Sequence, residues 1–422
     1  MSTSYSLNLF FLAMRFDMNI QTLIKTTLFY AILFVASVVC IQRIWFVDLF
    51  ERDVFLNWDA GHYHTIKGEG YHGFRVAFFP LFPMIWRFLS LGTFGISIFN
   101  ALVFFTSFVA LLRNLHIRRT EYVLLYLTVP CFIFFYLPFT ESLFFLCSTL
   151  IIVGLKNNKD HLVYMGLYVA ILCRPAFTVL IPALFITEFL QFRRDNLYFR
   201  LGAYTLISLL GILTVGWIQY LDTNEWFKFF SAQKEWGNHL QLPKLPFHSW
   251  ADGIVLRTDG VALFIGVIAG AFLSALLLKL KWVHNLRPTR EVIFSLAYLG
   301  GITLSVILFR GGSLFSLNRF VFATPFIIVA IHYWIHQKIQ FKAKHLTFIF
   351  GLVFLFWLLL GSYVHLQEII KFGLLSIYVL LLFALQSEKD SINKYSIYVL
   401  ITINFVFQIF FYLRVLNGEW IG

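Results

Sequence analysis

Residues 24–47 read IKTTLFYAILFVASVVCIQRIWFV, and this stretch decides the class of fold. Its charged residues, Lys25 and Arg43, lie near its two ends. A helix of about 20 apolar residues crosses the hydrocarbon core of a bilayer, so we expect a membrane-spanning helix here. No small-residue cleavage site follows, which predicts a retained first helix rather than a cleaved signal peptide.

The remainder of the chain has the same apolar character. Of its 422 residues, 59% are hydrophobic and only 13% are charged. A soluble globule cannot bury that much apolar surface, and the same composition excludes a disordered chain. The four cysteines form no CxxC pair and lie in apolar runs, so neither a disulfide framework nor a zinc site is expected: Cys40, Cys131, Cys147 and Cys173. The expected fold is an all-α polytopic membrane protein, with residues 1–422 in one membrane domain.

Hydropathy predicts about 13 membrane-spanning helices, within a range of roughly 11–13. They are placed at 24–47, 95–112, 121–137, 140–155, 161–173, 176–192, 201–221, 261–280, 291–309, 320–336, 345–361, 372–386 and 395–413. Residues 77–92 are apolar but contain Pro80, Pro83 and Arg87, which favours a re-entrant or interfacial segment. Two extracytoplasmic regions are long: 48–94, which includes that segment, and 222–260.

The net charge of +12 predicts the orientation of the chain. With the N-terminus in the cytoplasm, alternating helices place most basic residues on the cytoplasmic side and leave the outer side nearly neutral. The charge excess therefore indicates topology and membrane-lipid contact, not nucleic-acid binding. This topology fits a bacterial inner membrane facing the periplasm or an ER membrane facing the lumen. The short chain, rich in Phe, Ile and Lys, favours the bacterial case, and a monomer is expected.

The first long loop contains the residues of greatest chemical interest, Trp58-Asp59-Ala-Gly-His62-Tyr63-His64. His62 lies three residues after Asp59 and therefore on the same face if this stretch is helical. A carboxylate here can act as a general base towards a sugar hydroxyl. The alternative interpretation is a solvated loop aspartate beside interfacial aromatic residues. No metal-binding DxD motif is present and the histidines are loosely spaced, so neither a metal nor a cofactor is expected.

The order of several motifs resembles the GPI mannosyltransferase 2 (PIG-V-type) family, whose members are multi-span glycosyltransferases of the GT-C class. The matching motifs are spread over nearly the whole chain: Trp58-Asp59-Ala-x-His62, Gly70-Tyr71, Ala77-Phe-Phe-Pro-Leu-x-Pro83, Phe139-Thr-Glu-Ser-Leu-Phe144, Ala232-Gln-Lys-x-Trp-Gly237, Asn318-Arg319-Phe320 and Gly418-Glu-Trp420. The chain departs from the family pattern at Phe74, where an acidic residue is common, and at Phe139, where a tyrosine is usual.

The resemblance implies a GT-C fold and transfer of mannose, or a related hexose, from a polyprenyl-phosphate donor to a lipid-linked acceptor. The reaction would take place on the extracytoplasmic face without a metal, and Asp59 would match the family's catalytic aspartate. The two departures bear on the acceptor more than on the reaction.

Further candidate substrate contacts lie at the predicted outer ends of helices and in the second loop. Together with Trp58, His62 and Tyr63 they are Glu141, Arg174, Gln233, Trp236, Arg310 and Arg319. Arginine can hold a donor phosphate through charge-assisted hydrogen bonds, and tryptophan can stack on a sugar. Five of these six have an ordinary alternative: Glu141 as a helix start, Arg174 at a helix break, Trp236 as an interfacial aromatic, and Arg310 and Arg319 as headgroup contacts.

Two other functions compete with a transferase. A lipid or sugar transporter, or flippase, would place ionisable residues in mid-span and usually contains internal repeats, which this sequence lacks. A non-catalytic subunit of a glycosylation complex would share the fold without the reaction.

Overall fold

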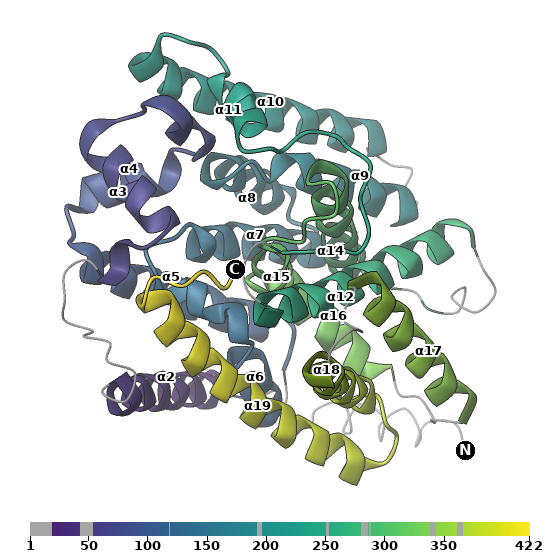
Figure 1. Cartoon of the computed structure of the whole chain (residues 1–422). Coiled ribbons are helices and arrows are strands. Elements are labelled where there is room, and N and C mark those ends of the chain that lie inside the picture. The colour runs from purple at the N-terminus through teal and green to yellow at the C-terminus, as the bar shows by residue number, and fades with distance from the viewer. Residues whose placement is uncertain are drawn as a thin grey trace.

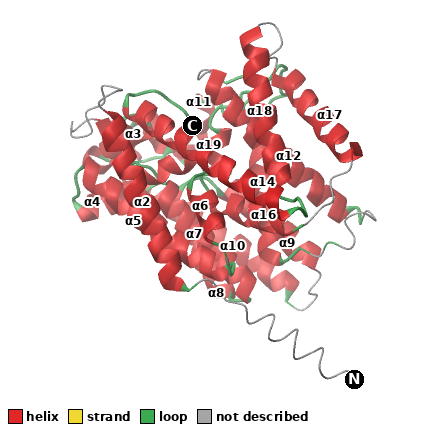
Figure 2. Ribbon diagram, turned by 90° about the horizontal axis from the view of Figure 1, so that it is seen from below, coloured by secondary structure: helices red, strands yellow, loops and turns green. Residues whose placement is uncertain are grey.

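The computed structural model describes residues 19–42, 54–117, 119–191, 196–249, 253–279, 286, 288–337, 343–360 and 366–422. Residues 43–47 of the expected first span and residues 48–53 of the first loop lie outside this part. The described residues form helices and loops with no strand, apart from one isolated bridge between His248 and Ser313 (Figure 2). The all-helical architecture expected from the sequence is therefore confirmed for this part of the chain.

The helices pack into a bundle, and a long loop joins α11 to α12 (Figure 1). In chain order they are α2 (Ile20–Gln42), η1 (Val54–Leu56), α3 (Asp59–Glu69), η2 (Gly73–Ala77), α4 (Leu81–Leu89), α5 (Thr93–Asn114), α6 (Thr120–Leu127), η3 (Pro130–Tyr136), α7 (Glu141–Asn157), α8 (Asp160–Cys173), α9 (Phe177–Gln191), α10 (Leu197–Thr223), α11 (Lys228–Glu235), α12 (Gly253–Leu277), α14 (Arg290–Phe309), α15 (Leu317–Phe322), α16 (Pro325–His336), α17 (Ala343–Leu360), α18 (Leu366–Ala384) and α19 (Asp390–Leu416).

Within the described residues, 6 helices are long and apolar enough to cross a bilayer, or 7 if the bent pair η3 and α7 forms one span. The 6 helices are α2, α5, α10, α12, α14 and α19. Each of the expected spans overlaps a helix, but several, such as α8, α9 and α16, are shorter than a full crossing. Thirteen separate crossings are therefore not confirmed.

The expected span at 121–137 is wrong as a single helix, because the chain breaks at Pro130. Val129, the residue before this proline, is extended (φ −52°, ψ 121°), since a proline disfavours helical conformation in its predecessor. α6 ends before it, η3 follows, and η3 meets α7 at an angle of 106°. Residues 320–336 are divided in the same way, at Thr324 before Pro325.

Amide side chains satisfy the backbone carbonyls that these breaks leave unpaired. Gln408 on α19 donates from Nε2 to the carbonyls of Leu127 and Val129, at 3.0 and 3.1 Å. Asn100 on α5 donates from Nδ2 to the carbonyls of Leu137 and Phe139, at 2.6 and 2.9 Å. Both amides are fully buried, and an unpaired polar group there is costly. The breaks are therefore built features of the bundle.

Glycines allow α12 and α14 to pack closely. A Cβ at Gly300 would lie 3.1 Å from the Cα of Gly270, and a Cβ at Gly266 would lie 1.9 Å from Oγ1 of Thr303. Small residues at such positions bring helix backbones together where apolar burial alone does not drive association in lipid. This pair of helices therefore depends on its glycines.

We expect Gly266→Ala to lower the free energy of unfolding by about 1–3 kcal/mol, because the added methyl group overpacks the α12–α14 contact. Thermal melting in detergent measures this. Gly202→Ala in α10 is the matched control, since a Cβ there meets nothing within 4 Å. Equal melting temperatures for the two variants would contradict the assignment.

Both long loops and the last residues of the chain gather at one end of the bundle, which we name the loop end. α11 of the second loop packs on η2 of the first (Figure 1). Gln219, near the end of α10, donates to the carbonyls of Val76 and Phe78 in the first loop, at 2.8 and 3.3 Å. The short helix α4 lies in the expected re-entrant segment and extends over about 14 Å, too little to cross a bilayer.

A cluster of ion pairs lies at the other end of α7 and α8, which we name the Glu188 cluster. Glu188 on α9 is buried and pairs with Arg290 on α14, accepts from Tyr204 Oη at 2.9 Å and contacts Arg200 at 3.4 Å. Arg200 also contacts Asp160, at the start of α8, at 3.2 Å. These pairs tie the ends of four helices together.

Candidate functional site

Arg319 on α15 joins the candidate catalytic residue to a buried carboxylate. Its Nη1 lies 2.7 Å from Oδ2 of Asp59, and its Nε lies 2.5 Å from Oε1 of Glu141. Glu141 is fully buried and also pairs with Arg174, which donates to Oγ1 of Thr140 at 2.8 Å. Two guanidinium groups and two carboxylates thus alternate from the helix break after α8 to the start of α3. We name these four residues the Arg319 network.

Asp59 is the exposed end of this network. Its side chain keeps 23% of its surface accessible, whereas that of Glu141 keeps none. It is the first residue of α3, where the partial positive charge of the helix N-terminus favours a carboxylate. Asp59 is therefore the one acid of the network whose side chain is open to the surface.

Trp58, directly before Asp59, has a strained backbone. Its φ of 58° and ψ of −130° place a bulky residue in a region that favours glycine. The indole holds this conformation, because Nε1 donates to the carbonyl of Gly418 at 3.0 Å and the ring packs 5.1 Å from that of Trp420. Strain of this kind concentrates at functional sites and fixes the direction in which the next side chain points.

Three aromatic rings enclose the Arg319 guanidinium. Its Cζ lies 5.1 Å from the ring of Phe134, 4.9 Å from that of Phe139 and 5.4 Å from that of Trp420. Burial opposes the charge, but the Glu141 and Asp59 carboxylates outweigh it and hold the pKa of Arg319 above its usual value. Arg319 is therefore a fixed cation with little freedom to move.

Asn318, directly before Arg319, connects the Arg319 network to α12 and to the last residues of the chain. The backbone N–H of Asn318 donates to Oδ1 of buried Asp259 at 2.8 Å, and its Nδ2 donates to the carbonyl of Ile421 at 2.8 Å. The segment 417–422 thus lies between α3 and α15, close to the centre of Figure 1. It forms one wall of the site.

An aromatic cluster joins the two long loops beside Asp59. The His62 ring lies 4.9 Å from Phe78, 5.4 Å from Phe74 and 6.2 Å from Trp236 of the second loop. Burial lowers the pKa of His62, Arg75 lowers it further, and Asp59 opposes the shift. The imidazole therefore packs as a neutral ring, while Trp236 remains 46% exposed.

Arg310, after the end of α14, binds the second loop through Asn238. Its Nε donates to Oδ1 of Asn238 at 3.3 Å, and it also pairs with the carbonyl of Phe315. Asn238 in turn donates to Oε1 of Gln233 at 2.8 Å. Gln233 and Arg310 are thus bound to the protein itself, which favours a positioning role over substrate contact.

The structure brings all ten candidate residues into one connected group at the loop end. Asp59, Trp58 and Trp236 reach its surface, and His62 lies half-buried beneath it. Tyr63 is buried, with its ring 5.1 Å from that of Phe82. The remaining five support this surface through hydrogen bonds and ion pairs: Glu141, Arg174, Gln233, Arg310 and Arg319. Their chemical roles remain predictions.

Sequence reasoning missed four residues that hold the site together. Trp420 and Asn318 lie in motifs that carried the family resemblance, but neither was assigned a place in the site. Asp259, an acid at the start of a long apolar run, carried a signal, because ionisable residues there usually have a task. Asn238 carried none, because its contact with Arg310 joins residues 72 positions apart.

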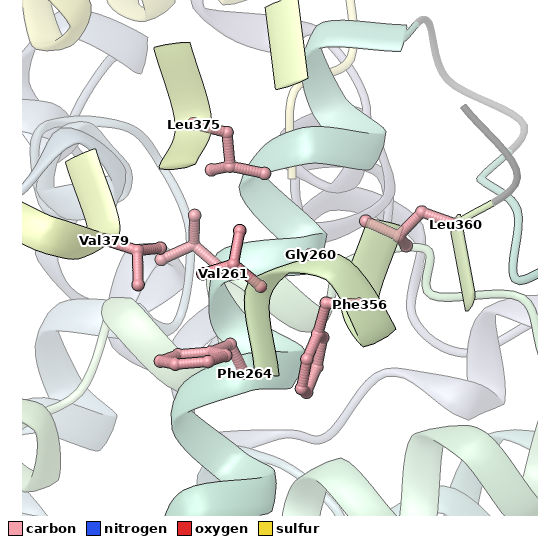
Figure 3. A pocket seen from close by; sticks show the side chains of 8 residues that line it. Gly260, Val261, Phe264, Phe356, Leu360, Leu375 and Val379 are labelled. Atoms are coloured by element: carbon pink, nitrogen blue, oxygen red, sulfur yellow. The ribbon is translucent and has the colours of Figure 1, made fainter. Parts of the chain in front are cut away.

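The described residues contain no group of three or more His, Cys, Asp or Glu side chains arranged to hold a metal ion. A pocket between α12, α17 and α18 is lined by apolar residues, among them Gly260, Phe264, Phe356 and Val379 (Figure 3). It contains none of the candidate site residues, although Gly260 follows Asp259 directly. The candidate site around Asp59 and this apolar pocket are therefore separate regions of the described structure.

No family model, curated protein or solved structure matches the chain. The resemblance to PIG-V-type mannosyltransferases therefore stays a prediction from the motifs, and the geometry of the site has to carry the functional argument.

We expect Glu141→Gln to lower the free energy of unfolding by about 3–5 kcal/mol, because it leaves buried guanidinium charge without its carboxylate. Asp59→Asn removes a partly exposed partner and is expected to cost about 1 kcal/mol or less. Thermal melting of both variants in detergent compares them. A larger loss for Asp59→Asn would show that the partly exposed pair, not the buried one, holds the network.

The lowered pKa of His62 predicts a dependence of stability on pH. The unfolded chain takes up a proton at about pH 6.5, while folded His62 does so only at lower pH, so stability falls as the pH drops below about 6.5. His62→Gln removes this contribution. Melting temperatures between about pH 7.5 and 5 should therefore fall less steeply for the variant than for the wild type, and parallel curves would oppose the assignment.

Proposed function

We propose that the protein is a membrane glycosyltransferase. It moves mannose or a related hexose from a polyprenyl-phosphate donor to a lipid-linked acceptor at the loop end, which is the extracytoplasmic face. The acceptor oxygen attacks the anomeric carbon and loses its proton to Asp59. The bond between that carbon and the phosphate oxygen breaks, and the lipid phosphate leaves with the electron pair. The motif resemblance supports the GT-C class and inversion of configuration at that carbon.

The observation that carries this proposal is a partly exposed carboxylate anchored through one oxygen. Arg319 binds Oδ2 of Asp59, and the strained Trp58 fixes the backbone before it. A general base needs a fixed position within hydrogen-bonding distance of the proton that it removes. Asp59 has such an anchor, and part of its side chain remains exposed.

Two further features suit a sugar linked to a lipid phosphate. Trp58 precedes Asp59, Trp236 lies near His62, both are more than one-third exposed, and such faces can stack on a sugar ring. In the described part of the chain, Nη1 of Arg174 is buried without a hydrogen-bond partner. An unpaired buried donor is costly, and a phosphate oxygen would satisfy it. Arg174 is therefore the best candidate to bind the lipid phosphate that leaves.

Asp59→Asn keeps the size of the side chain and removes the base, so we expect turnover to fall about 10²–10⁴-fold. The assay follows transfer from radiolabelled polyprenyl-phosphate-mannose to membrane glycolipid acceptors in proteoliposomes containing the purified protein alone. Glu69→Gln is the matched control, because Glu69 is an exposed acid at the other end of α3. Near wild-type turnover by folded Asp59→Asn would refute the role of Asp59.

A transporter is the second candidate, because buried ion pairs lie at both ends of the same helices. The Arg319 network and the Glu188 cluster are separated by the lengths of α7 and α8, roughly 20–25 Å. Ion pairs at the two ends of a helix bundle can form and break in turn, so that a pathway opens to only one side of the membrane at a time. Movement of a sugar-lipid across the bilayer of the same proteoliposomes, without transfer, would favour this function over a transferase.

A further inference from the structure

The second loop contains a stretch of apolar side chains that the protein leaves uncovered. Leu240 is 70% exposed, Leu242 is 87% exposed and Leu245 is 64% exposed. We name residues 239–246 the leucine strap. In water three such side chains so close together would be unfavourable, so they mark a surface that meets an apolar partner.

Backbone hydrogen bonds hold the leucine strap firmly against the end of α14. The N–H of His239 donates to the carbonyl of Phe309 at 3.1 Å, and that of Gln241 donates to the carbonyl of Leu308 at 2.9 Å. The N–H of Lys244 donates to the carbonyl of Gly311 at 3.0 Å. The strap is thus fixed through its backbone, while the side chains of Leu240 and Leu242 stay exposed.

Gly312 allows this close approach. A Cβ at this position would lie 2.5 Å from the carbonyl oxygen of Lys244, and its φ of 94° favours glycine. The buried Phe247, just after the strap, donates its N–H to the carbonyl of Leu359 on α17 at 2.7 Å. The strap is therefore attached to the ends of two apolar helices, and its exposed leucines do not reflect a loose loop.

The helices beside the strap identify its partner. Leu304 and Phe309 on α14 are exposed apolar residues, and so are Phe354 and Leu358 on α17. α14 is among the helices able to cross a bilayer, so its exposed apolar face meets lipid. The strap continues this face at the level where the helices end.

We propose that the leucine strap inserts into the membrane interface. Its leucines enter the boundary between headgroups and acyl chains, and the exposed Lys244 between them reaches the lipid phosphates. The second loop is then anchored to the bilayer surface independently of the reaction catalysed. Because Trp236 lies in the same loop beside His62, this anchoring places the aromatic cluster where lipid-borne molecules arrive.

The test places a fluorescent label at single cysteines of the full-length protein in phospholipid nanodiscs. Leu242→Cys is made in a Cys40→Ser background, since Cys131, Cys147 and Cys173 are buried. Glu235→Cys, on an exposed polar position of α11 in the same loop, is the matched control. Each labelled protein is titrated with lipids that carry a nitroxide near the headgroup and, separately, with aqueous iodide.

Insertion by about 5–10 Å predicts at least about twofold stronger quenching by the lipid nitroxide at position 242 than at position 235, and the reverse order for iodide. Equal iodide quenching at both positions would overturn the proposal, because the strap would then lie in water. Protection of position 242 from both quenchers would also overturn it, in favour of a second copy of the chain or another protein covering the strap. The same measurement at Leu240→Cys provides an independent repeat.

Discussion

A polar group withdrawn from water needs a partner within the protein, and this constraint shapes the site and the helix breaks around it. Its clearest expression is Arg319, which shares its guanidinium between Asp59 and Glu141 and lies among three aromatic rings. Glu141 in turn needs two guanidinium groups because it has no access to solvent. The geometry of the site therefore results from neutralising buried charge. Asp59 is held in place because it neutralises Arg319.

The same constraint explains why the broken helices are tolerated. A proline interrupts a helix and leaves carbonyl groups without donors. Asn100 and Gln408 supply those donors from helices that are distant in sequence. Gln219 and Asn318 do the same for the first loop and for the chain end. Four amide side chains thus fix the irregular segments that surround the site.

The loop end combines rigidity and exposure. The Arg319 network runs inwards from Asp59, and the aromatic cluster lies beside Asp59. The leucine strap continues the apolar surface of the helices. In the proposed transferase, lipid-linked substrates would remain in the membrane while their polar groups reach Asp59. The Glu188 cluster at the opposite end is closed by its own partners and ties the helix ends together.

Much of the candidate site could be predicted because its chemical character is local in sequence. Asp59 and Glu141 stand out as acids beside long apolar runs, and both bind Arg319 in the structure. The partners of Asp59 could not be ranked, because Arg310 and Arg319 look alike in sequence. Only packing shows that Arg319 binds the carboxylates while Arg310 holds Asn238 of the second loop.

The sequence by itself determined the helical class and the apolar surface, since both depend on composition and on the length of each run. It predicted the helix break at Arg174, which precedes Pro175, but not the breaks at Pro130 and Pro325 inside expected spans. The tertiary structure decided which breaks divide a span, which arginine pairs with Asp59 and how residues 417–422 complete the wall. These depend on contacts between residues hundreds of positions apart, and the need to pair each buried charge and carbonyl selects among them.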